Sequence, residues 1–592
     1  MTEAALQFDD ADEIGRVAAV DTSRVVVDVT NSTLLTRVGI GSLVAIRGAT
    51  EREYLISIVE RVTRSLKDDL VDAGDETEDM LIGVTPTDLL RAAMIGTYRT
   101  VDGARSNVFK RGADSFPQID RSCFVLAGAN LQRFMGILGN DLKEEERLRL
   151  GVFVADRTAE AIASGDRLFQ RHAAVLGSTG SGKSWTVALI LERAARLKHP
   201  NIVVFDMHGE YAPLADRSRG GMATRLRIAG PGDLAKPAAD ALFLPYWLLN
   251  RDEMLSMILD RSDANAPNQA SRFTTHIRTL KRQTLLREGE TKTAETFTVD
   301  SPIPYEMGEL LALLRTDNTQ KGVGKTGPVK GEWEDKLTRF ISRLEAKLED
   351  RRYGFMFQPS TAASAYDWLA AQVQTLLGAD GPEGIKIVDF SEVPADVLPV
   401  VTGTLARLLY DVQFWTDPDS RTPVTLLCDE AHLYLPVRDD ADAVQRQALG
   451  AFERIAKEGR KYGFSLMVVS QRPSDVSRTI LSQCNNFLAL RLTNDTDQGV
   501  IKRLMPDSLA GLTAELPLLD TGEALLLGDA VLLPTRIKLD APSIPPDSAT
   551  RDFWREWGTK GPDPDALRDA VGCSRSQTRA ARVGSAAQER GA

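Results

Sequence analysis

The sequence predicts an α/β protein built on a parallel sheet, with a small β-barrel ahead of the sheet and a helical segment inserted into it. Two observations in this chain of 592 residues support the sheet: short apolar runs alternate with helical patterns, and a glycine-rich loop joins one apolar run to a long helical pattern. Buried strands between helices are typical of parallel sheets. A chain of this length is also too long for one core, so we expect several domains.

The barrel is predicted from residues 14–62, which alternate in β-branched side chains, as in "SRVVVDVT" and "GSLVAIRG", with Gly and Asn at the breaks. More strand-like sequence follows, and residues 139–166 are interpreted as a linker. We therefore assign 1–160 to an N-terminal barrel domain and its linker.

The parallel sheet is predicted from five apolar runs, each of which is followed by polar residues. These runs are "NIVVFDMHGEY", "GIKIVDFSEV", "VTLLCDEAHLYLP", "GFSLMVVSQRP" and "NNFLALRLT". We assign 161–250 and 381–540 to the two parts of this α/β core. Between them, 251–380 has mostly helical periodicity and is interpreted as an insertion. The C-terminal extension, 541–592, ends in a stretch without periodicity, which we expect to be mobile.

Within the insertion, one amphipathic stripe at helical spacing predicts a core-facing helix. Its members are Trp333, Leu337, Phe340, Ile341, Leu344 and Leu348. The basic residues Arg272, Lys281 and Arg282 on another predicted helix are interpreted as a solvated face.

The glycine-rich loop "GSTGSGKS" fits the pattern G-x-x-x-x-G-K-[ST], in which backbone N–H groups close around phosphate at a helix N-terminus. An apolar strand precedes the loop and a helical pattern follows it, which is the context that this motif requires. Lys183 would reach the outer phosphates of ATP, and the hydroxyl of Ser184 would bind Mg²⁺. The residues expected to bind the cofactor are Gly177, Ser178, Thr179, Gly180, Ser181, Gly182, Lys183, Ser184 and Trp185.

Two carboxylates follow the apolar run "VTLLC", and hydrolysis of ATP needs such groups beside the phosphates. Asp429 would hold Mg²⁺, largely through water, and Glu430 would act as the base for the attacking water. The alternative is an acidic pair on a solvated turn. Gln471, which ends the next apolar run, could sense the γ-phosphate or the attacking water, since ligands bind at the carboxyl ends of parallel strands. Its alternative role is to complete a turn.

The composition excludes few functions. The net charge of −11 argues against a chain that coats nucleic acid over its whole surface, although a narrow basic channel remains compatible with it. No apolar run is long enough to span a bilayer, and the N-terminus is acidic where a signal peptide would be basic, so we expect a cytoplasmic protein with no membrane contact. Four widely spaced cysteines match no metal spacing and suit a reducing compartment.

Several motifs, taken in their order, resemble the HerA family of hexameric ATPases, which is related to DNA pumps of the FtsK type. They are "GSTGSGKS", "DMHGEY", "LPYWLLN", "CDEAHLYLP" and "EGRKYGFSLMVVSQRPSDV". The combination of "DMHGEY", "EGRKYG" and "SQRPS" is the most specific. The resemblance implies a RecA-like P-loop ATPase core, an N-terminal barrel, a helical insertion and a homo-hexameric ring whose pore holds double-stranded DNA.

Ring ATPases of this kind also use an arginine from the neighbouring subunit, because a guanidinium matches the charge that grows on the γ-phosphate. The resemblance makes Arg171, Arg454 and Arg460 candidates, and for each the alternative is a surface salt bridge. Asp206, His208 and Glu210 match the family's "D-x-H-G-E-Y", which topology places near the nucleotide, although His208 could equally be a turn residue.

Two functions stay open. The chain could be a motor that moves along or unwinds double-stranded DNA, or a ring scaffold that assembles and activates a partner enzyme in anti-phage defence. We find no second catalytic centre in the sequence, so any cutting or NAD consumption would come from another protein. The resemblance implies a separate nuclease such as NurA, or a nuclease or sirtuin-like effector of antiviral defence.

Overall fold

The computed structural model describes residues 6–70, 82–100, 107–112, 115–140, 142–324, 327–378, 384–505, 507–548 and 551–577. The chain forms two compact units, each built from separate stretches of sequence. Unit 1 comprises Met1–Arg193, Met467–Asp475 and Leu481–Ser543, and unit 2 comprises Ala194–Leu466, Val476–Ile480 and Ile544–Ala592. The predicted α/β core is therefore shared between the two units, which are described separately below.

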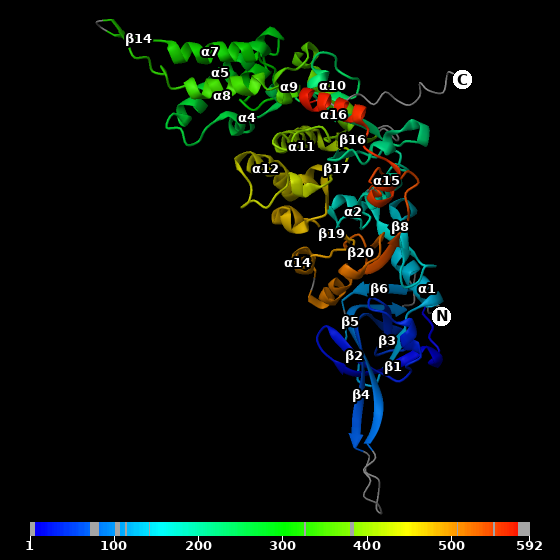
Figure 1. Ribbon diagram of the computed structural model, residues 1–592. Coiled ribbons are helices and arrows are strands. Elements are labelled where there is room, and N and C mark those ends of the chain that lie inside the picture. The colour runs from blue at the N-terminus through cyan, green and yellow to red at the C-terminus, as the bar shows by residue number, and fades with distance from the viewer. Residues whose placement is uncertain are drawn as a thin grey trace, which may run out of the picture. The chain divides into compact units, whose positions relative to one another are not determined.

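The N-terminal part of unit 1 is a β-barrel, as predicted. Its sheet has the order β2-β1-β7-β3-β4-β5-β6, its pairs are antiparallel, and β2 also pairs with β5, which closes six strands into a ring. Buried Val25, Val44 and Leu55 belong to its core. In Figure 1, β4 and β5 run side by side beyond the other strands. The strands are β1 (Glu13–Val20), β2 (Arg24–Val29), β3 (Leu43–Arg47), β4 (Glu53–Leu70), β5 (Ile82–Thr100), β6 (Asn107–Arg111) and β7 (Ser122–Val125).

The second part of unit 1 is a mixed sheet. Its central strand β10 (Ala173–Leu176) pairs in parallel with β19 (Asn486–Ala489) and with the end of β18 (Phe464–Ser470). Antiparallel strands then continue the sheet from β19 in the order β20-β21-β8-β9. They are β20 (Glu523–Gly528), β21 (Thr535–Leu539), β8 (Arg147–Phe153) and β9 (Glu160–Ser164), and the helices of this part are α1 (Gly128–Asn140), α2 (Gly165–Gln170), α3 (Lys183–Ala194), α13 (Arg478–Leu481, only its last residue within unit 1) and α14 (Asp495–Leu504).

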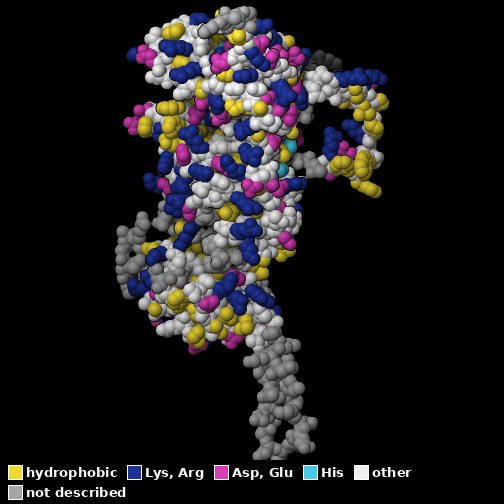
Figure 2. Space-filling model, turned by 90° about the vertical axis from the view of Figure 1, so that its left-hand side faces the viewer, with side chains coloured by type: hydrophobic (Ala, Val, Ile, Leu, Met, Phe, Trp, Pro, Cys, Tyr) yellow, Lys and Arg dark blue, Asp and Glu magenta, His cyan; other side chains and the backbone are white. Residues whose placement is uncertain are grey.

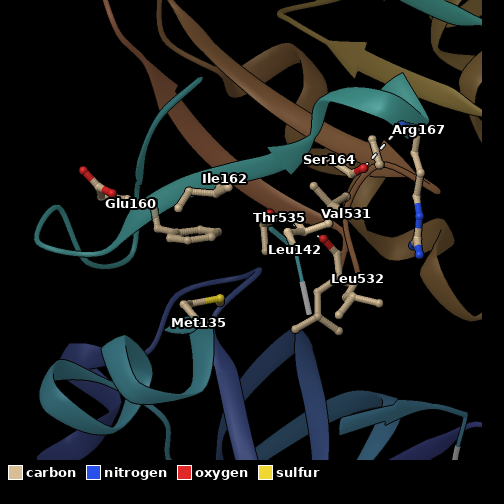
Figure 3. A pocket seen from close by; sticks show the side chains of 12 residues that line it. Met135, Leu142, Glu160, Ile162, Ser164, Arg167, Val531, Leu532 and Thr535 are labelled. Carbon is tan, nitrogen blue, oxygen red and sulfur yellow. Dashed lines mark hydrogen bonds between the residues drawn. The ribbon is translucent and has the colours of Figure 1, made fainter. Parts of the chain in front are cut away.

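Residues 139–166, predicted to be a linker, thus contain two strands of this sheet. The side chains of Leu148 and Leu150 alternate inward along β8 and are buried, a pattern too short to stand out in the sequence. A cavity of about 100 Å³ lies in the same unit, between Met135 of α1, Ile162 of β9 and Val531 (Figure 3). None of the residues that line it belongs to the glycine-rich loop.

Unit 2 contains a parallel sheet in the order β13-β12-β16-β11-β17, which confirms the predicted sheet type. Its strands are β11 (Ile202–Asp206), β12 (Thr224–Ile228), β13 (Ala241–Leu242), β16 (Ile385–Asp389) and β17 (Val424–Cys428). All five residues of β11, β16 and β17 are buried, as expected for strands with both faces covered. Helices α11 (Leu398–Trp415) and α12 (Ala443–Glu458) pack against each other in this unit.

The insertion between β13 and β16 is mainly helical, as predicted. It contains α4 (Arg251–Ile258), α5 (Ala266–Arg287), α6 (Thr293–Thr296), α7 (Met307–Thr319), α8 (Thr338–Glu349), α9 (Gly354–Phe357), α10 (Trp368–Leu377) and a short hairpin of β14 (Gly322–Gly324) and β15 (Gly327–Val329). Phe340, Ile341 and Leu344 of the predicted stripe are buried on α8. The helix starts only at Thr338, so Trp333 precedes it.

The interpretation of Lys281 as part of a solvated face is wrong. Lys281 is 1% exposed, and its ammonium donates to the carbonyl oxygens of Val299 (2.7 Å) and Ser301 (2.6 Å). Burial lowers the pKa of Lys281 to about 7. Arg272 also forms an ion pair, with Asp317 at 2.6 Å. The aliphatic stem of a lysine can lie in a core when its head reaches backbone oxygens, which helical periodicity does not reveal.

The C-terminal extension contains two helices, α15 (Phe553–Thr559) and α16 (Pro564–Ser576). The expected mobile end falls largely on 578–592, which lie outside the described residues. Over the face shown in Figure 2, acidic and basic side chains are intermingled, so this face has no broad patch of one sign. None of the helices within the described ranges is long and apolar enough to span a membrane.

Candidate nucleotide site

The glycine-rich loop of unit 1 connects β10 to α3, as its motif predicts. Gly180 (φ 72°) and Gly182 (φ 105°) adopt left-handed backbone conformations that side chains disfavour. Gly177 is required for a different reason: a Cβ there would lie 2.8 Å from the Cβ of Leu490. The glycines therefore permit a tight loop against the neighbouring strand, with the first turn of α3 directly behind it.

Lys183, the first residue of α3, carries the strongest indication of a ligand. Its side chain is buried, with 8% exposed, yet no residue in the described part of the chain forms an ion pair or hydrogen bond with its ammonium. A buried cation without an anion is costly, and the N-terminus of α3 adds positive potential at the same place. The loop therefore fits a phosphate group. Ser184 is half-buried beside Lys183, and Trp185 is 44% exposed.

Gln471 lies beside this loop in unit 1. It follows β18, and its side-chain oxygen Oε1 accepts a hydrogen bond from the hydroxyl of Thr179 at 2.6 Å. An open cavity of about 460 Å³ is lined by these two residues together with Ser178, Asn494 and Asp497. The space next to the loop thus has a polar lining, as a phosphate and its attacking water require.

The carboxylates of Asp429 and Glu430 lie in unit 2, directly after β17. Asp429 is 3% exposed and Glu430 is 9% exposed, so the alternative of a solvated acidic turn does not describe them. Burial, and next the negative charge of Glu430, raise the pKa of Asp429 well above its usual range. Two adjacent buried carboxylates repel each other, so this pair fits a divalent metal ion such as Mg²⁺.

The turn that carries Glu430 is held in an unusual backbone conformation. Glu430 has φ 43° and ψ 45°, a left-handed conformation that persists in a non-glycine residue only where its surroundings enforce it. The hydroxyl of buried Tyr434 donates to the backbone carbonyl of Asp429 at 3.1 Å, and the N–H of Leu433 donates to that of Glu430 at 2.9 Å. Nδ1 of His432 lies 3.3 Å from Oε2 of Glu430. Sequence reasoning missed His432, although it follows the pair by two residues.

Asp206, in the "DMHGEY" motif, shapes the turn after β11. It is fully buried and accepts hydrogen bonds from the backbone N–H groups of His208, Gly209, Glu210 and Tyr211. Burial raises the pKa of Asp206 to about 6, against the effect of these hydrogen bonds. The side chain of His208 is exposed on this turn.

The three candidate arginines have different surroundings. Arg171 forms an ion pair with Asp529 in unit 1 and lies at the end of β10 opposite to the loop. Arg460, in the short helix η13 (Gly459–Tyr462), is exposed, and nothing in the described ranges pairs with its guanidinium.

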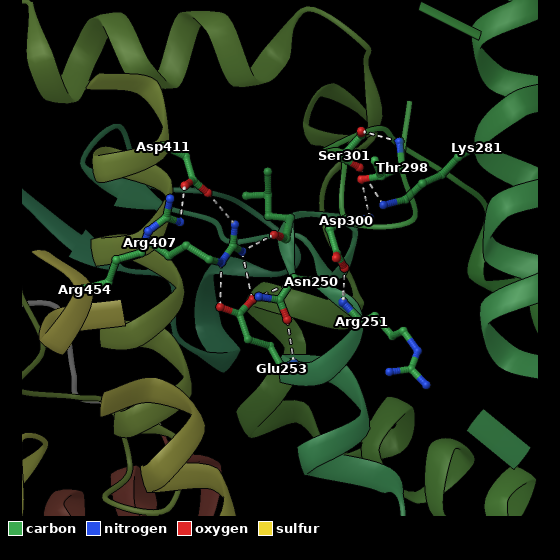
Figure 4. A network of polar contacts seen from close by, with 11 residues as sticks. Asn250, Arg251, Glu253, Lys281, Thr298, Asp300, Ser301, Arg407, Asp411 and Arg454 are labelled. Atoms are coloured by element: carbon green, nitrogen blue, oxygen red, sulfur yellow. Dashed lines mark hydrogen bonds and ion pairs between the residues drawn. The ribbon is translucent and has the colours of Figure 1, made fainter. Parts of the chain in front are cut away.

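Arg454 belongs to a polar network of unit 2 (Figure 4). Its guanidinium lies 3.8 Å from Asp411 and 5.0 Å from the centre of the Tyr410 ring. Asp411 also pairs with Arg407, which binds Glu253 at 2.7 Å. These contacts give Arg454 a packing role within its own chain.

No cluster of three or more His, Cys, Asp and Glu side chains within the described residues is arranged to hold a metal.

These features define a P-loop ATPase with a RecA-like core. They are the parallel sheet, the phosphate loop with a buried lysine between strand and helix, and the paired carboxylates after another strand. Residues 148–409 match the family model described as "Helicase HerA, central domain". Over these residues the chain is similar to the HerA family.

Curated relatives show the same likeness. A probable helicase of Methanocaldococcus jannaschii is 27% identical over 66% of this chain and 67% of its own length. The DNA double-strand break repair helicase HerA of Sulfolobus acidocaldarius is 27% identical over 62% of this chain and 65% of its own length. The chain thus spans about two thirds of the length of these relatives. Among solved structures, the bacterial conjugative coupling protein TrwB shows a loose likeness, with a TM-score of 0.43 and 14% identity over 69% of this chain and 91% of its own.

Proposed function

We propose that this protein hydrolyses ATP to drive movement along double-stranded DNA. The observation that carries the proposal is the buried ammonium of Lys183, which has no anionic partner among the described residues and lies at the N-terminus of α3. A nucleotide phosphate supplies that partner. The DNA component is supported by the family, since the relative from Sulfolobus acidocaldarius is named a DNA double-strand break repair helicase.

In the proposed reaction, the phosphate loop and Lys183 hold the outer phosphates of ATP. Ser184 and Asp429 would hold Mg²⁺, which when bound neutralises charge on the phosphates. Glu430 accepts the proton of the attacking water, and Gln471 orients that water or the γ-phosphate. Water adds to the γ-phosphorus as the bond to the ADP oxygen breaks, which yields ADP and phosphate.

We also propose that the active unit is a homo-hexameric ring around duplex DNA. Arg460 supports this part, because an exposed guanidinium without a partner in the described chain is available to a neighbouring subunit. Arg171 is a second candidate, because it lies at the opposite end of β10 from its own phosphate loop. Sites completed by a neighbour require head-to-tail contacts, and these close into rings. A partner nuclease or NAD-consuming effector in antiviral defence is proposed from the family resemblance alone.

The proposal is tested by the rate of ATP hydrolysis with and without linear duplex DNA. We expect magnesium-dependent hydrolysis that duplex DNA stimulates and that Lys183→Ala abolishes. Hydrolysis that DNA leaves unchanged would favour the ring scaffold for a partner enzyme over the motor. A wild-type protein that binds no ATP would contradict both.

A further inference from the structure

The hydroxyl of Tyr211 is an unexplained polar group in unit 2. Tyr211 ends the turn that follows β11, and its side chain is fully buried, with 0% exposed. No residue in the described ranges forms a hydrogen bond with this hydroxyl. Buried tyrosine hydroxyls usually find a partner, and each one that does not requires an explanation.

The turn that ends in Tyr211 starts beside the turn that carries Asp429 and Glu430, which are proposed to act on ATP. Strands β11 and β17 are parallel neighbours in which Phe205 pairs with Cys428, and the N–H of Asp429 donates to the carbonyl of Phe205 at 3.2 Å. The turns that follow the two strands therefore start side by side at one edge of the sheet. The backbone N–H of Tyr211 is fixed by Oδ2 of Asp206 at 2.9 Å.

The charges that act most strongly on the phenol are negative. Burial raises the pKa of Tyr211 well above its usual range, and among the charges the largest effect comes from Asp429, followed by Asp206, Glu210 and Glu430. A neutral phenol can donate a hydrogen bond, and these carboxylates can accept one. Asp206 is already used by four backbone N–H groups of its own turn, which leaves Asp429 as the foremost acceptor.

We propose that the hydroxyl of Tyr211 donates a hydrogen bond to the carboxylate of Asp429 when nucleotide and metal ion are bound, and so holds this carboxylate in its metal-binding orientation. Tyr211 is then a positioning residue that acts through Asp429. This inference rests on the proposed function, because it assumes that Asp429 binds Mg²⁺. Hydrogen-bond partners of metal-binding carboxylates commonly change metal affinity by about 10- to 100-fold when they are removed.

Tyr434 provides a matched control. It is as buried as Tyr211, and its hydroxyl also serves Asp429, but it donates to the backbone carbonyl at 3.1 Å in the present structure. Tyr434→Phe therefore removes a hydrogen bond that already exists, whereas Tyr211→Phe removes a hydroxyl that has no partner within the described residues. The two substitutions should therefore differ in their effects on stability and on metal dependence.

The experiment measures the Kd of a fluorescent ADP for the full-length variants in EDTA and in saturating Mg²⁺, together with the Tm of each protein in EDTA. The magnesium factor is the Kd in EDTA divided by the Kd in saturating Mg²⁺. For Tyr211→Phe we expect an unchanged Kd in EDTA, a magnesium factor reduced about tenfold, and a Tm equal to or above that of the wild type. For Tyr434→Phe we expect a full magnesium factor and a lower Tm.

Asp429→Asn separates failure of this inference from failure of the proposed function. If Asp429→Asn loses the magnesium factor while Tyr211→Phe retains it fully, Tyr211 has no positioning role and the inference is overturned. If Asp429→Asn itself retains the factor, the metal assignment within the proposed function fails. A Tyr211→Phe protein with a strongly lowered Tm would also overturn the inference, because the hydroxyl would then support the resting fold.

Discussion

Thr179 of the phosphate loop donates a hydrogen bond from its hydroxyl to Oε1 of Gln471 at 2.6 Å. Both residues lie in unit 1, at the carboxyl ends of the parallel neighbours β10 and β18. The contact fixes which side of the Gln471 amide faces the loop, and its NH₂ group is then directed elsewhere. The proposed role of Gln471, to donate to a γ-phosphate or to orient an attacking water, would use this NH₂ group.

We predict that Gln471→Ala lowers kcat for ATP hydrolysis by about 10²-fold, because water orientation is lost while phosphate binding persists. Thr179→Val, which removes the hydroxyl and keeps the shape, should have a smaller effect. Steady-state hydrolysis combined with equilibrium ATP binding checks this. A Gln471→Ala protein within twofold of the wild-type kcat would show that Gln471 only completes a turn.

Lys183→Met is expected to raise the Tm of the nucleotide-free protein, because it replaces a buried, unpaired cation with an apolar side chain of similar length. The same variant should lose the stabilisation that ATP gives to the wild type, since stabilisation by a ligand requires binding. Thermal unfolding with and without ATP measures both effects. An unchanged response to ATP would contradict the assignment of Lys183 to the phosphates.

Most of the fold could be predicted from local patterns. Alternation in 14–62 predicted the barrel, and the buried runs around Asp206 and Asp429 predicted the parallel sheet, since both patterns repeat over several residues. The strands β8 and β9 pair with each other in a short hairpin, and only β8 joins the rest of the sheet, through β21, which is distant in sequence. Their place in this sheet therefore left no local signal.

Some residues of the candidate site could likewise be predicted from the sequence, and others could not. The phosphate loop and the pair Asp429 and Glu430 were predicted because their motifs are contiguous. The lack of a hydrogen-bond partner for the Tyr211 hydroxyl among the described residues could not be predicted. Whether a buried hydroxyl has a partner depends on the packing of two separate turns. Arg454 and Arg460 have similar sequence surroundings, and only tertiary contacts distinguish the network around Arg454 from the exposed Arg460.

Asp206→Asn should change the pH dependence of stability. Burial raises the pKa of Asp206 from 3.8 to about 6 in the folded protein, so its contribution to stability is present below pH 3.8 and is lost as pH rises to 6. The loss amounts to about 3 kcal/mol. The wild-type Tm minus the Asp206→Asn Tm should therefore fall between pH 4 and pH 6. A difference that is constant over this range would contradict the raised pKa.

Arg460→Ala should lower kcat by about 10³-fold and leave ATP binding and oligomer size nearly unchanged, as expected for an arginine that acts on a neighbour's γ-phosphate. Arg454→Ala serves as the control and should mainly lower the Tm, because its guanidinium packs on Tyr410. Mixing Arg460→Ala with Glu430→Gln subunits should restore part of the activity, since some interfaces then combine an intact arginine with an intact base. If the two variants co-assemble and the mixture stays inactive, Arg171 becomes the better candidate.

The central claim is that hydrolysis at Lys183 and Glu430 moves the protein along duplex DNA, and displacement of a triplex-forming strand from a linear duplex measures that movement most directly. The account predicts ATP-dependent displacement by the wild type, and none by Glu430→Gln, which should bind ATP and DNA without moving. Wild-type protein that hydrolyses ATP in the presence of the duplex and leaves the third strand in place would contradict the account.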